Sequence, residues 1–288
     1  MQNTSKNILT RRLTEKWGQP LQIQRTSSVS GGSINDAYRI ETNKGDFFVK
    51  INQNCPSDFF EKEAHGLETL RKSGSIKVPE VLDCFAEGQM RFLVINFIPA
   101  EMPKADFWAD FGEKLAKLHQ NTQDQFGLEV DNYMGAWPQK NERLDKWADF
   151  FISCRLIPLV KAAYDRKMMD KKLLGQFERF YAKVAEIFPD EKPALIHGDL
   201  WSGNFIHTKE VMLIDPAVAY SHREADLAMT KLFGGFDAAL YEAYQRTYPT
   251  EKGVEQRYDF YNIYPLLIHV LLFGEGYLSG IKNTLSKF

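Results

Sequence analysis

Residues 196–204 read IHGDLWSGN, and residues 213–216 read LIDP. A short apolar run leads into the polar residues of each stretch, at residues 194–196 and 211–214. These runs predict two short buried strands, each followed by a loop. Asn204 lies five residues after Asp199, and Asp215 lies sixteen residues after Asp199. Alone, Asp and Asn are common turn formers, and an Asp often caps a helix. The ordered set of three, placed after apolar strands, favours a functional site over turns and caps.

The spacing of Asp199 and Asn204 matches the kinase catalytic loop H-R-D-x-x-x-x-N, which a metal-binding Asp follows later in the chain. Phosphoryl transfer needs a carboxylate that orients and deprotonates the acceptor hydroxyl. It also needs hard oxygen ligands for the Mg²⁺ that bridges the nucleotide phosphates. We therefore predict Asp199 as the catalytic base, and Asn204 with Asp215 as the metal ligands.

The N-terminal part of the chain has mainly the pattern of a small sheet. A short helix is expected over residues 8–17, and residues 21–51 alternate as three antiparallel strands. Residues 60–70 have helical spacing after an expected N-cap at Ser57. Two further strands are expected over residues 78–98. This part is predicted as an N-terminal nucleotide-binding lobe over residues 1–98.

Helical patterns dominate after a connector near residues 96–103. Residues 107–118, 147–156 and 173–187 are each predicted as one amphipathic helix. We expect an α+β, protein-kinase-like fold in which residues 99–288 form a larger catalytic and substrate-binding lobe. A cleft between two lobes is a usual place for a ligand.

Two features of the N-terminal part fit a nucleotide. Gly31, Gly32 and Ser33 lie in a loop between strands, where backbone N–H groups can contact phosphates, although most Gly-Gly turns are simple hairpins. Lys50 ends a β-type run, as does the kinase lysine that contacts phosphates. Its alternative role is that of a solvated strand lysine.

The helix over residues 60–70 offers a partner for Lys50. Glu63 lies 13 residues after the lysine and is predicted to pair with it, with Glu61 and Glu68 as rivals on the same helix. In the connector, adenine is expected to bond backbone groups at Asn96, Phe97 and Ile98. This last assignment rests on position alone.

Composition excludes several classes of protein. The 288 residues include 36 Lys and Arg and 38 Asp and Glu, so a formal net charge of −2 argues against binding nucleic acid through bulk charge. Three widely spaced cysteines fit a reduced, cytoplasmic protein without a disulfide framework. The longest nearly apolar stretch, residues 263–273, is about half the ~20 residues of a bilayer span, so no membrane insertion is expected.

Longer motifs, spread over nearly the whole chain, make the resemblance to one family of kinases specific. The chain resembles the fructosamine kinase (ketosamine-3-kinase) family, within the aminoglycoside-phosphotransferase and protein-kinase-like superfamily. The strings that carry this resemblance are GGSIN (31–35), EAHGL (63–67), FGLEVDNYMGAWPQKN (126–141), WADFF (147–151) with Arg155, HGDLWSGN (197–204) and HREADLAM (222–229). The wider aminoglycoside and choline kinases usually lack the tryptophan of HGDLWSGN.

The resemblance implies an ATP- and Mg²⁺-dependent kinase that phosphorylates the sugar 3-hydroxyl of ketosamines. The unstable 3-phosphate would then release the amine, which is a deglycation repair. The acceptor would be a small-molecule or protein-bound ketosamine, and the protein a monomer or weak homodimer. The alternatives are another small-molecule kinase of this fold, acting on an aminoglycoside or choline, and a non-catalytic nucleotide-binding module.

The resemblance also implies roles for individual residues. It assigns Asp199, Asn204, Asp215, Lys50 and Glu63 as above. It places Trp201 against the sugar or its amine, with core burial as the alternative. It places His269 at the sugar pocket, with a hydrogen-bonded core histidine as the alternative. Asp226 is expected to bond the catalytic-loop backbone, and residues 222–224 either shape the acceptor pocket or form an ion network.

Overall fold

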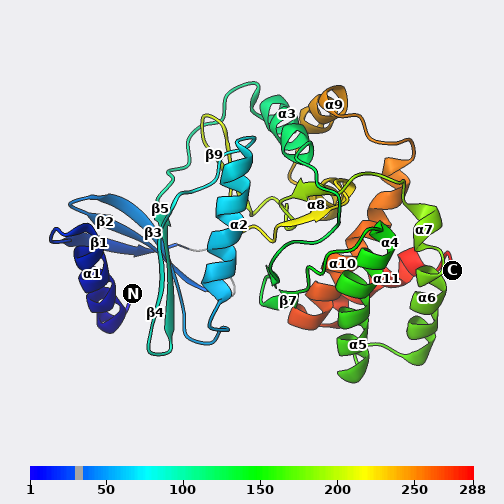
Figure 1. The fold of residues 1–288 in the computed structure, drawn as a ribbon, viewed down its shortest axis with the longest axis horizontal. Coiled ribbons are helices and arrows are strands. Elements are labelled where there is room, and N and C mark those ends of the chain that lie inside the picture. The colour runs from blue at the N-terminus through cyan, green and yellow to red at the C-terminus, as the bar shows by residue number, and fades with distance from the viewer. Residues whose placement is uncertain (30–34) are drawn as a thin grey trace.

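A five-stranded antiparallel sheet forms one end of the molecule, and helices form most of the other (Figure 1). The computed structural model describes residues 1–29 and 35–288. The strands of the sheet are β1 (Ile23–Ser28), β2 (Asp36–Thr42), β3 (Gly45–Asn52), β4 (Val81–Glu87) and β5 (Met90–Asn96). Their spatial order is β1-β2-β3-β5-β4, and all neighbours are antiparallel. The expected α+β class and the three-stranded meander over residues 21–51 are confirmed.

Two helices accompany this sheet. Helix α1 (Asn3–Trp17) starts five residues before the predicted helix, and its buried Leu9 and Leu13 belong to the same apolar cluster as Val49 of β3. Helix α2 (Phe59–Ser73) begins after Asp58, so the predicted N-cap at Ser57 is wrong by one residue. It ends at Gly74 in the left-handed conformation, which satisfies the last turn at little steric cost.

The helical part is built around α10, which is buried along most of its length. Its elements are α3 (Phe107–His119), α4 (Trp147–Phe150), the π-helical turn η1 (Phe151–Leu156), α5 (Ile157–Asp165), α6 (Lys171–Tyr181), α7 (Val184–Ile187), α8 (Glu224–Leu232), α9 (Ala238–Thr247), α10 (Val254–Phe273), the 3₁₀ turn η2 (Glu275–Tyr277) and α11 (Leu278–Leu285). The single helix predicted over residues 173–187 is wrong, because the chain breaks between α6 and α7. Val184 and Phe188 are thereby buried in the core of this part.

Three two-stranded ladders position the loops of the helical part. The pairs are β8 (Ala194–Ile196) with β11 (Ala219–Ser221), β9 (Phe205–His207) with β10 (Val211–Leu213), and β6 (Asn132–Met134) with β7 (Trp137–Gln139). Strand β8 leads into the loop of Asp199, and β10 leads into Asp215. The buried strand pieces predicted before these residues are therefore present.

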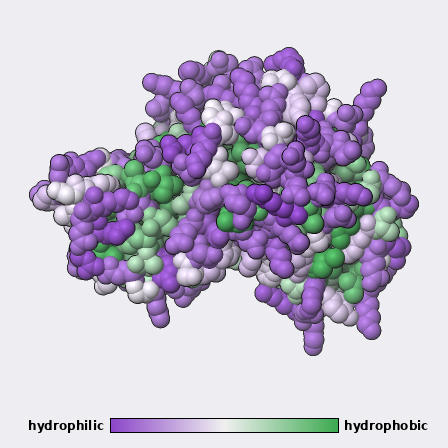
Figure 2. All heavy atoms as spheres, viewed as in Figure 1, coloured by the Kyte–Doolittle hydropathy of each residue, from purple (hydrophilic) through white to green (hydrophobic). Residues whose placement is uncertain are grey.

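Hydrophilic side chains cover most of the face of the molecule drawn in Figure 2, and apolar side chains show there as small separate patches. The large apolar residues instead form clusters inside the sheet end and the helical end. No helix in the described parts of the chain has the length and apolarity that crossing a membrane requires.

Candidate active site

The loop after β8 brings Asp199 and Asn204 together. The Asn204 amide donates from Nδ2 to the Asp199 backbone oxygen at 2.8 Å and to its Oδ2 at 3.0 Å. Burial raises the pKa of the Asp199 carboxyl to about 7, while the hydrogen bond from Asn204 opposes this and the charges of Asp215 and Asp226 add to it. Asp199 is thus a carboxylate that can take up a proton near neutral pH, as a general base must.

Asp226 holds this loop in place. Its carboxylate accepts hydrogen bonds from the backbone N–H groups of His197, at 2.7 Å, and Gly198, at 2.9 Å, and contacts His119 Nε2 at 3.2 Å. Burial acts to raise the pKa of the Asp226 carboxyl, but the hydrogen bond and charge of His119 hold it below its ordinary value. The expected role of Asp226 at the loop backbone is confirmed.

His197 joins the catalytic loop to the segment that carries Asp215. Its Nε2 lies 2.9 Å from the backbone oxygen of Ile214, and its own backbone oxygen accepts from the N–H of Ala217 at 2.9 Å. Asp215, between these two contacts, has a φ of 55°, a left-handed conformation that few non-glycine residues adopt. The backbone on both sides therefore fixes where the Asp215 carboxylate points.

Lys50 connects the sheet to this site. Its Nζ lies 2.7 Å from Oε1 of Glu63 and 2.6 Å from Oδ1 of Asp215, and the residue is only 6% exposed. Burial acts to lower the pKa of Lys50, but the two carboxylates raise it above its ordinary value, so the ammonium stays charged. The structure thus selects Glu63 among the three candidates, whereas Glu68 pairs with Arg71.

The oxygen atoms at Asn204 and Asp215 suit a hard divalent cation. Because the Asn204 Nδ2 is engaged by Asp199, its amide oxygen is the atom left for a ligand role. The Asp215 side chain is 42% exposed and keeps room for further ligands. Residues 1–29 and 35–288 contain no cluster of three or more His, Cys, Asp or Glu that would hold a metal alone. The oxygens of Asn204 and Asp215 could supply the one or two protein ligands that Mg²⁺ commonly takes beside phosphate oxygens and water.

The glycine-rich loop and the connector are the two other segments predicted to contact the nucleotide. Gly31, Gly32 and Ser33 lie outside the described residues. In the connector, the N–H of Asn96 donates to the Glu80 backbone oxygen and that of Phe97 to the Asp46 backbone oxygen. Among the described residues the N–H of Ile98 has no backbone partner, which makes it the candidate donor for an adenine.

Trp201 and His269 occupy different surroundings. Trp201 is 36% exposed, so burial in the core is excluded, and its ring covers Gly203. His269 is partly buried on α10, where its Nδ1 lies 2.8 Å from the backbone oxygen of Pro265. Its ring contacts Phe233 at a centroid distance of 5.0 Å. His269 is thus hydrogen-bonded within its own helix, and its role at a sugar pocket stays a prediction.

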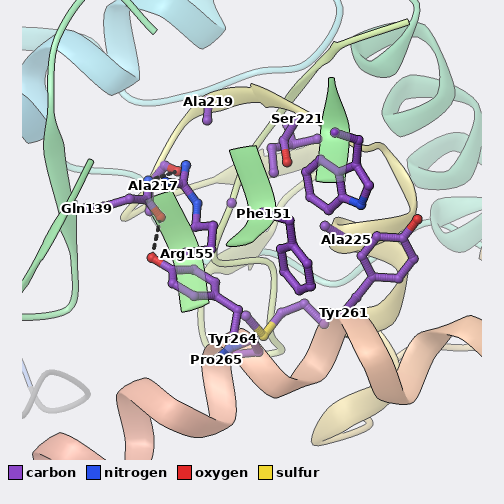
Figure 3. Close-up of a pocket in the computed structure, with 14 residues that line it drawn as sticks. Gln139, Phe151, Arg155, Ala217, Ala219, Ser221, Ala225, Tyr261, Tyr264 and Pro265 are labelled. Carbon is purple, nitrogen blue, oxygen red and sulfur yellow. Dashed lines mark hydrogen bonds between the residues drawn. The ribbon is translucent and has the colours of Figure 1, made fainter. Parts of the chain in front are cut away.

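A cavity of about 40 Å³ lies behind the catalytic loop, bordered by Gly198 (Figure 3). Gln139, Arg155 and Tyr264 supply polar groups to its lining, and the Tyr264 hydroxyl donates to Gln139 Oε1 at 2.7 Å. Arg155 is 5% exposed and donates to the amide oxygen of Asn141 at 2.7 Å. Gln139 and Arg155 belong to the strings that carry the family resemblance, but none of these three residues was predicted as a site residue. The signal for Arg155 is an arginine within the mostly apolar segment 147–156.

Residues 222–224 form the expected ion network. Arg223 pairs with Glu191 at 2.7 Å, and Arg257 donates to both carboxylate oxygens of Glu224. The His222 ring contacts the backbone oxygen of Pro189. These groups are buried and pair with one another, so the network accounts for them without a role at the acceptor.

Comparisons with known proteins identify the family of the chain. The fructosamine kinase family model matches residues 5–288, so the chain belongs to the fructosamine kinase family. It is 39% identical to a probable ketoamine kinase of Synechocystis over 97% of this chain and 95% of that protein. It is 35% identical to a chloroplastic protein-ribulosamine 3-kinase of Arabidopsis thaliana, over 96% of this chain and 85% of that protein.

Solved structures show the same fold. A provisionally named fructosamine-3-kinase from Thermobifida fusca superposes with a TM-score of 0.86 at 29% identity, covering 97% of this chain and 98% of that one. An aminoglycoside phosphotransferase crystallised with AMP-PNP and hygromycin B has a TM-score of 0.63 at 16% identity, covering 97% and 94%. The expected protein-kinase-like fold is therefore confirmed.

Proposed function

We propose that this chain is an ATP-dependent kinase that phosphorylates the sugar 3-hydroxyl of ketosamines, of the fructosamine or ribulosamine type. The observation that carries the proposal is the convergence of Lys50 on Glu63 and Asp215, beside the loop in which Asn204 bonds Asp199. Family membership and the names of the relatives, ketoamine kinase and protein-ribulosamine 3-kinase, support the acceptor.

Lys50 and Asp199 have different roles in the proposed reaction. Lys50 binds the nucleotide phosphates, and Asp199 accepts the proton of the sugar 3-hydroxyl as that oxygen bonds the γ-phosphorus and the bond to the β-phosphate oxygen breaks. The products are ADP and a ketosamine 3-phosphate. Most of the rate enhancement comes from positioning and charge neutralisation.

Mg²⁺ is the proposed metal, held by the oxygens of Asn204 and Asp215. When bound it neutralises charge on the transferring phosphoryl group. The protein's own part is to keep both side chains in place, through the bond from Asn204 to Asp199 and through the backbone around Asp215.

The acceptor is proposed to lie beside Asp199, with the hydroxyl-rich end of the sugar toward the cavity behind Gly198. The polar lining by Arg155 and Gln139 suits such a chain end. Trp201, about a third exposed and two residues after Asp199, is proposed to cover the sugar or its amine substituent. His269 lies one turn beyond Pro265, which borders the cavity, and is proposed to extend the same acceptor surface.

The lobes are proposed to divide between Ile98 and Pro99, where the sheet has ended and the connector begins. We also propose a cytoplasmic location, a monomer or weak homodimer, and a role in deglycation repair. The test of function is ATP turnover against free and protein-bound ketosamines, an aminoglycoside and choline. We expect turnover with ketosamines alone. Turnover with an aminoglycoside or choline alone would contradict the proposal, and MgADP binding without any turnover would indicate a non-catalytic module.

A further inference from the structure

The β6–β7 hairpin is anchored to the segment that follows Asp215. Asn132 donates from Nδ2 to the backbone oxygen of Val218 at 2.8 Å, and Gln139 donates from Nε2 to that of Ala217 at 3.1 Å. Figure 3 shows Gln139 beside Ala217, with the hydroxyl of Tyr264 bonded to its amide. Asn132 and Gln139 are at least 95% buried. The hairpin is therefore a fixed part of the helical lobe.

The other face of β6 reaches the nucleotide-binding lobe. Neighbouring residues of a strand point to opposite faces, so Tyr133 points away from the side on which Asn132 is anchored. Its hydroxyl donates to Oδ1 of Asp58, the residue before α2, at 2.8 Å. Its ring packs on Phe59 at a centroid distance of 5.1 Å. A directed contact thus joins the hairpin to the first turn of α2.

That end of α2 is the one from which Glu63 projects. Glu63 lies about one turn beyond Asp58 and bonds Lys50 at 2.7 Å. The other end of α2 is held separately, because the N–H of Leu213 donates to the backbone oxygen of Lys77. The pair of His65 with Glu129 also links α2 to the segment before the hairpin, but both side chains are about a third exposed or more, so it contributes little.

We propose that Tyr133 is a positioning residue: its hydroxyl fixes the start of α2 on the helical lobe, so that Glu63 already meets Lys50 before the nucleotide binds. The inference rests on the proposed function, in which Lys50 binds phosphates. A lysine held in its binding geometry loses less conformational freedom when the ligand arrives. Without the hydroxyl, α2 turns away more often and the competent arrangement is less populated.

The test is Tyr133→Phe, which keeps the ring and removes only the hydroxyl. Asp58 is 42% exposed and is solvated by water in the variant, so the fold is retained. We expect the Kd for MgADP, measured by calorimetry, to rise roughly three- to tenfold, the range for the net contribution of a typical hydrogen bond whose acceptor is partly solvated. Hydrogen exchange is expected to accelerate over residues 59–63. Tyr241→Phe, whose hydroxyl contacts Thr230 on α8, is the matched control and should change neither.

Tyr133→Phe in a Glu63→Gln background distinguishes positioning of Glu63 from a general destabilisation of the contact between the lobes. If Tyr133 acts through Glu63, Tyr133→Phe weakens MgADP binding less than twofold further there. An unchanged Kd in the single variant, or the same fold-loss in both backgrounds, overturns the inference. If the wild-type chain binds no nucleotide, the proposed function fails instead, and hydrogen exchange over residues 59–63 still reports whether the hydroxyl holds α2.

Discussion

The ammonium of Lys50 lies 2.6 Å from the Asp215 carboxylate, although 165 residues separate them in the sequence. The contact joins the sheet to the segment that carries Asp215, the proposed metal ligand. Glu63 completes the group from α2 at 2.7 Å. Three segments of the chain therefore depend on one buried cation for their mutual position.

Lys50→Met is expected to leave the buried Glu63 carboxylate without its cation. Removing one partner of a buried ion pair costs about 3 kcal/mol, so the free energy of unfolding should fall by that order. We also expect kcat/KM for ATP to fall at least about 100-fold, since a charge aimed at the transferring group is lost. Lys72→Met, at an exposed position on the same α2 helix, should change neither quantity. Near-normal turnover in Lys50→Met would contradict the role of this lysine.

Gly198→Ala tests the close approach behind the catalytic loop. A Cβ at Gly198 would lie 2.0 Å from the backbone oxygen of Ala217, and its φ is +85°. Gly74, in the left-handed conformation at a φ of +65°, is the control, since a Cβ there meets nothing within 4 Å. Both variants carry backbone strain of about 1–2 kcal/mol. Only Gly198→Ala should lose a further 1–3 kcal/mol, roughly, and most of its turnover. Equal effects on unfolding would contradict this account.

Trp201→Ala is expected to change the KM for the ketosamine but not the KM for ATP. The indole is 36% exposed, so its removal should change stability little. We expect the KM for the ketosamine to rise about tenfold with the KM for ATP unchanged, because the ring is proposed to contact the acceptor and not the nucleotide. A rise in both constants, measured in the same assay, would point instead to a disturbed catalytic loop.

Stability is expected to decrease below neutral pH because of His222. Burial lowers the pKa of the His222 imidazole below its ordinary value, so the folded state holds it neutral. Between that lowered pKa and the unfolded value of about 6.5, the unfolded chain binds more protons. The contribution of neutral His222 to the free energy of unfolding is therefore full above about pH 6.5. It is lost as the pH falls from there to the lowered pKa of the folded state. His197, also buried with a lowered pKa, acts in the same direction.

The measurement is the urea midpoint between about pH 7.5 and about pH 5.5. Asp199, whose pKa is raised to about 7, acts in the opposite direction, so the comparison between the wild type and His222→Gln carries the test. As the pH falls, the wild type should lose more of its midpoint, or gain less, than His222→Gln, which keeps a polar group near the Pro189 oxygen. An identical pH dependence in the two proteins would show that His222 does not carry this effect.

The pairing of Asp199 with Asn204 was predictable because it is local in the sequence. Asp199 and Asn204 are held in one short loop, and the apolar strands before them fix where the loop starts. The pairing of Lys50 with Glu63, in preference to Glu61 or Glu68, could also be predicted from the sequence. It lies three residues after Phe60 and four before Leu67, both buried, so it projects beside the apolar stripe of α2. Glu68 lies off that stripe and pairs with Arg71 at the surface.

Other features depend on contacts that the local sequence does not encode. Strands β6 and β7 have three residues each, and Tyr133 meets Asp58 across 75 positions. The break between α6 and α7 has no Pro or Gly to mark it, and burial of Val184 in the core accompanies it. Tertiary packing overrides helix propensity at such a point.

Asp199 is proposed to direct phosphate to the 3-hydroxyl of a ketosamine. The most direct measurement is NMR of the product formed from ATP and a ribulosamine or fructosamine, with phosphorus–proton coupling locating the phosphate. We expect the wild type to place it on the oxygen of C3. Asp199→Asn should form no product while keeping its Kd for MgADP within about threefold. Phosphate on another hydroxyl, or normal turnover by Asp199→Asn, would contradict the account.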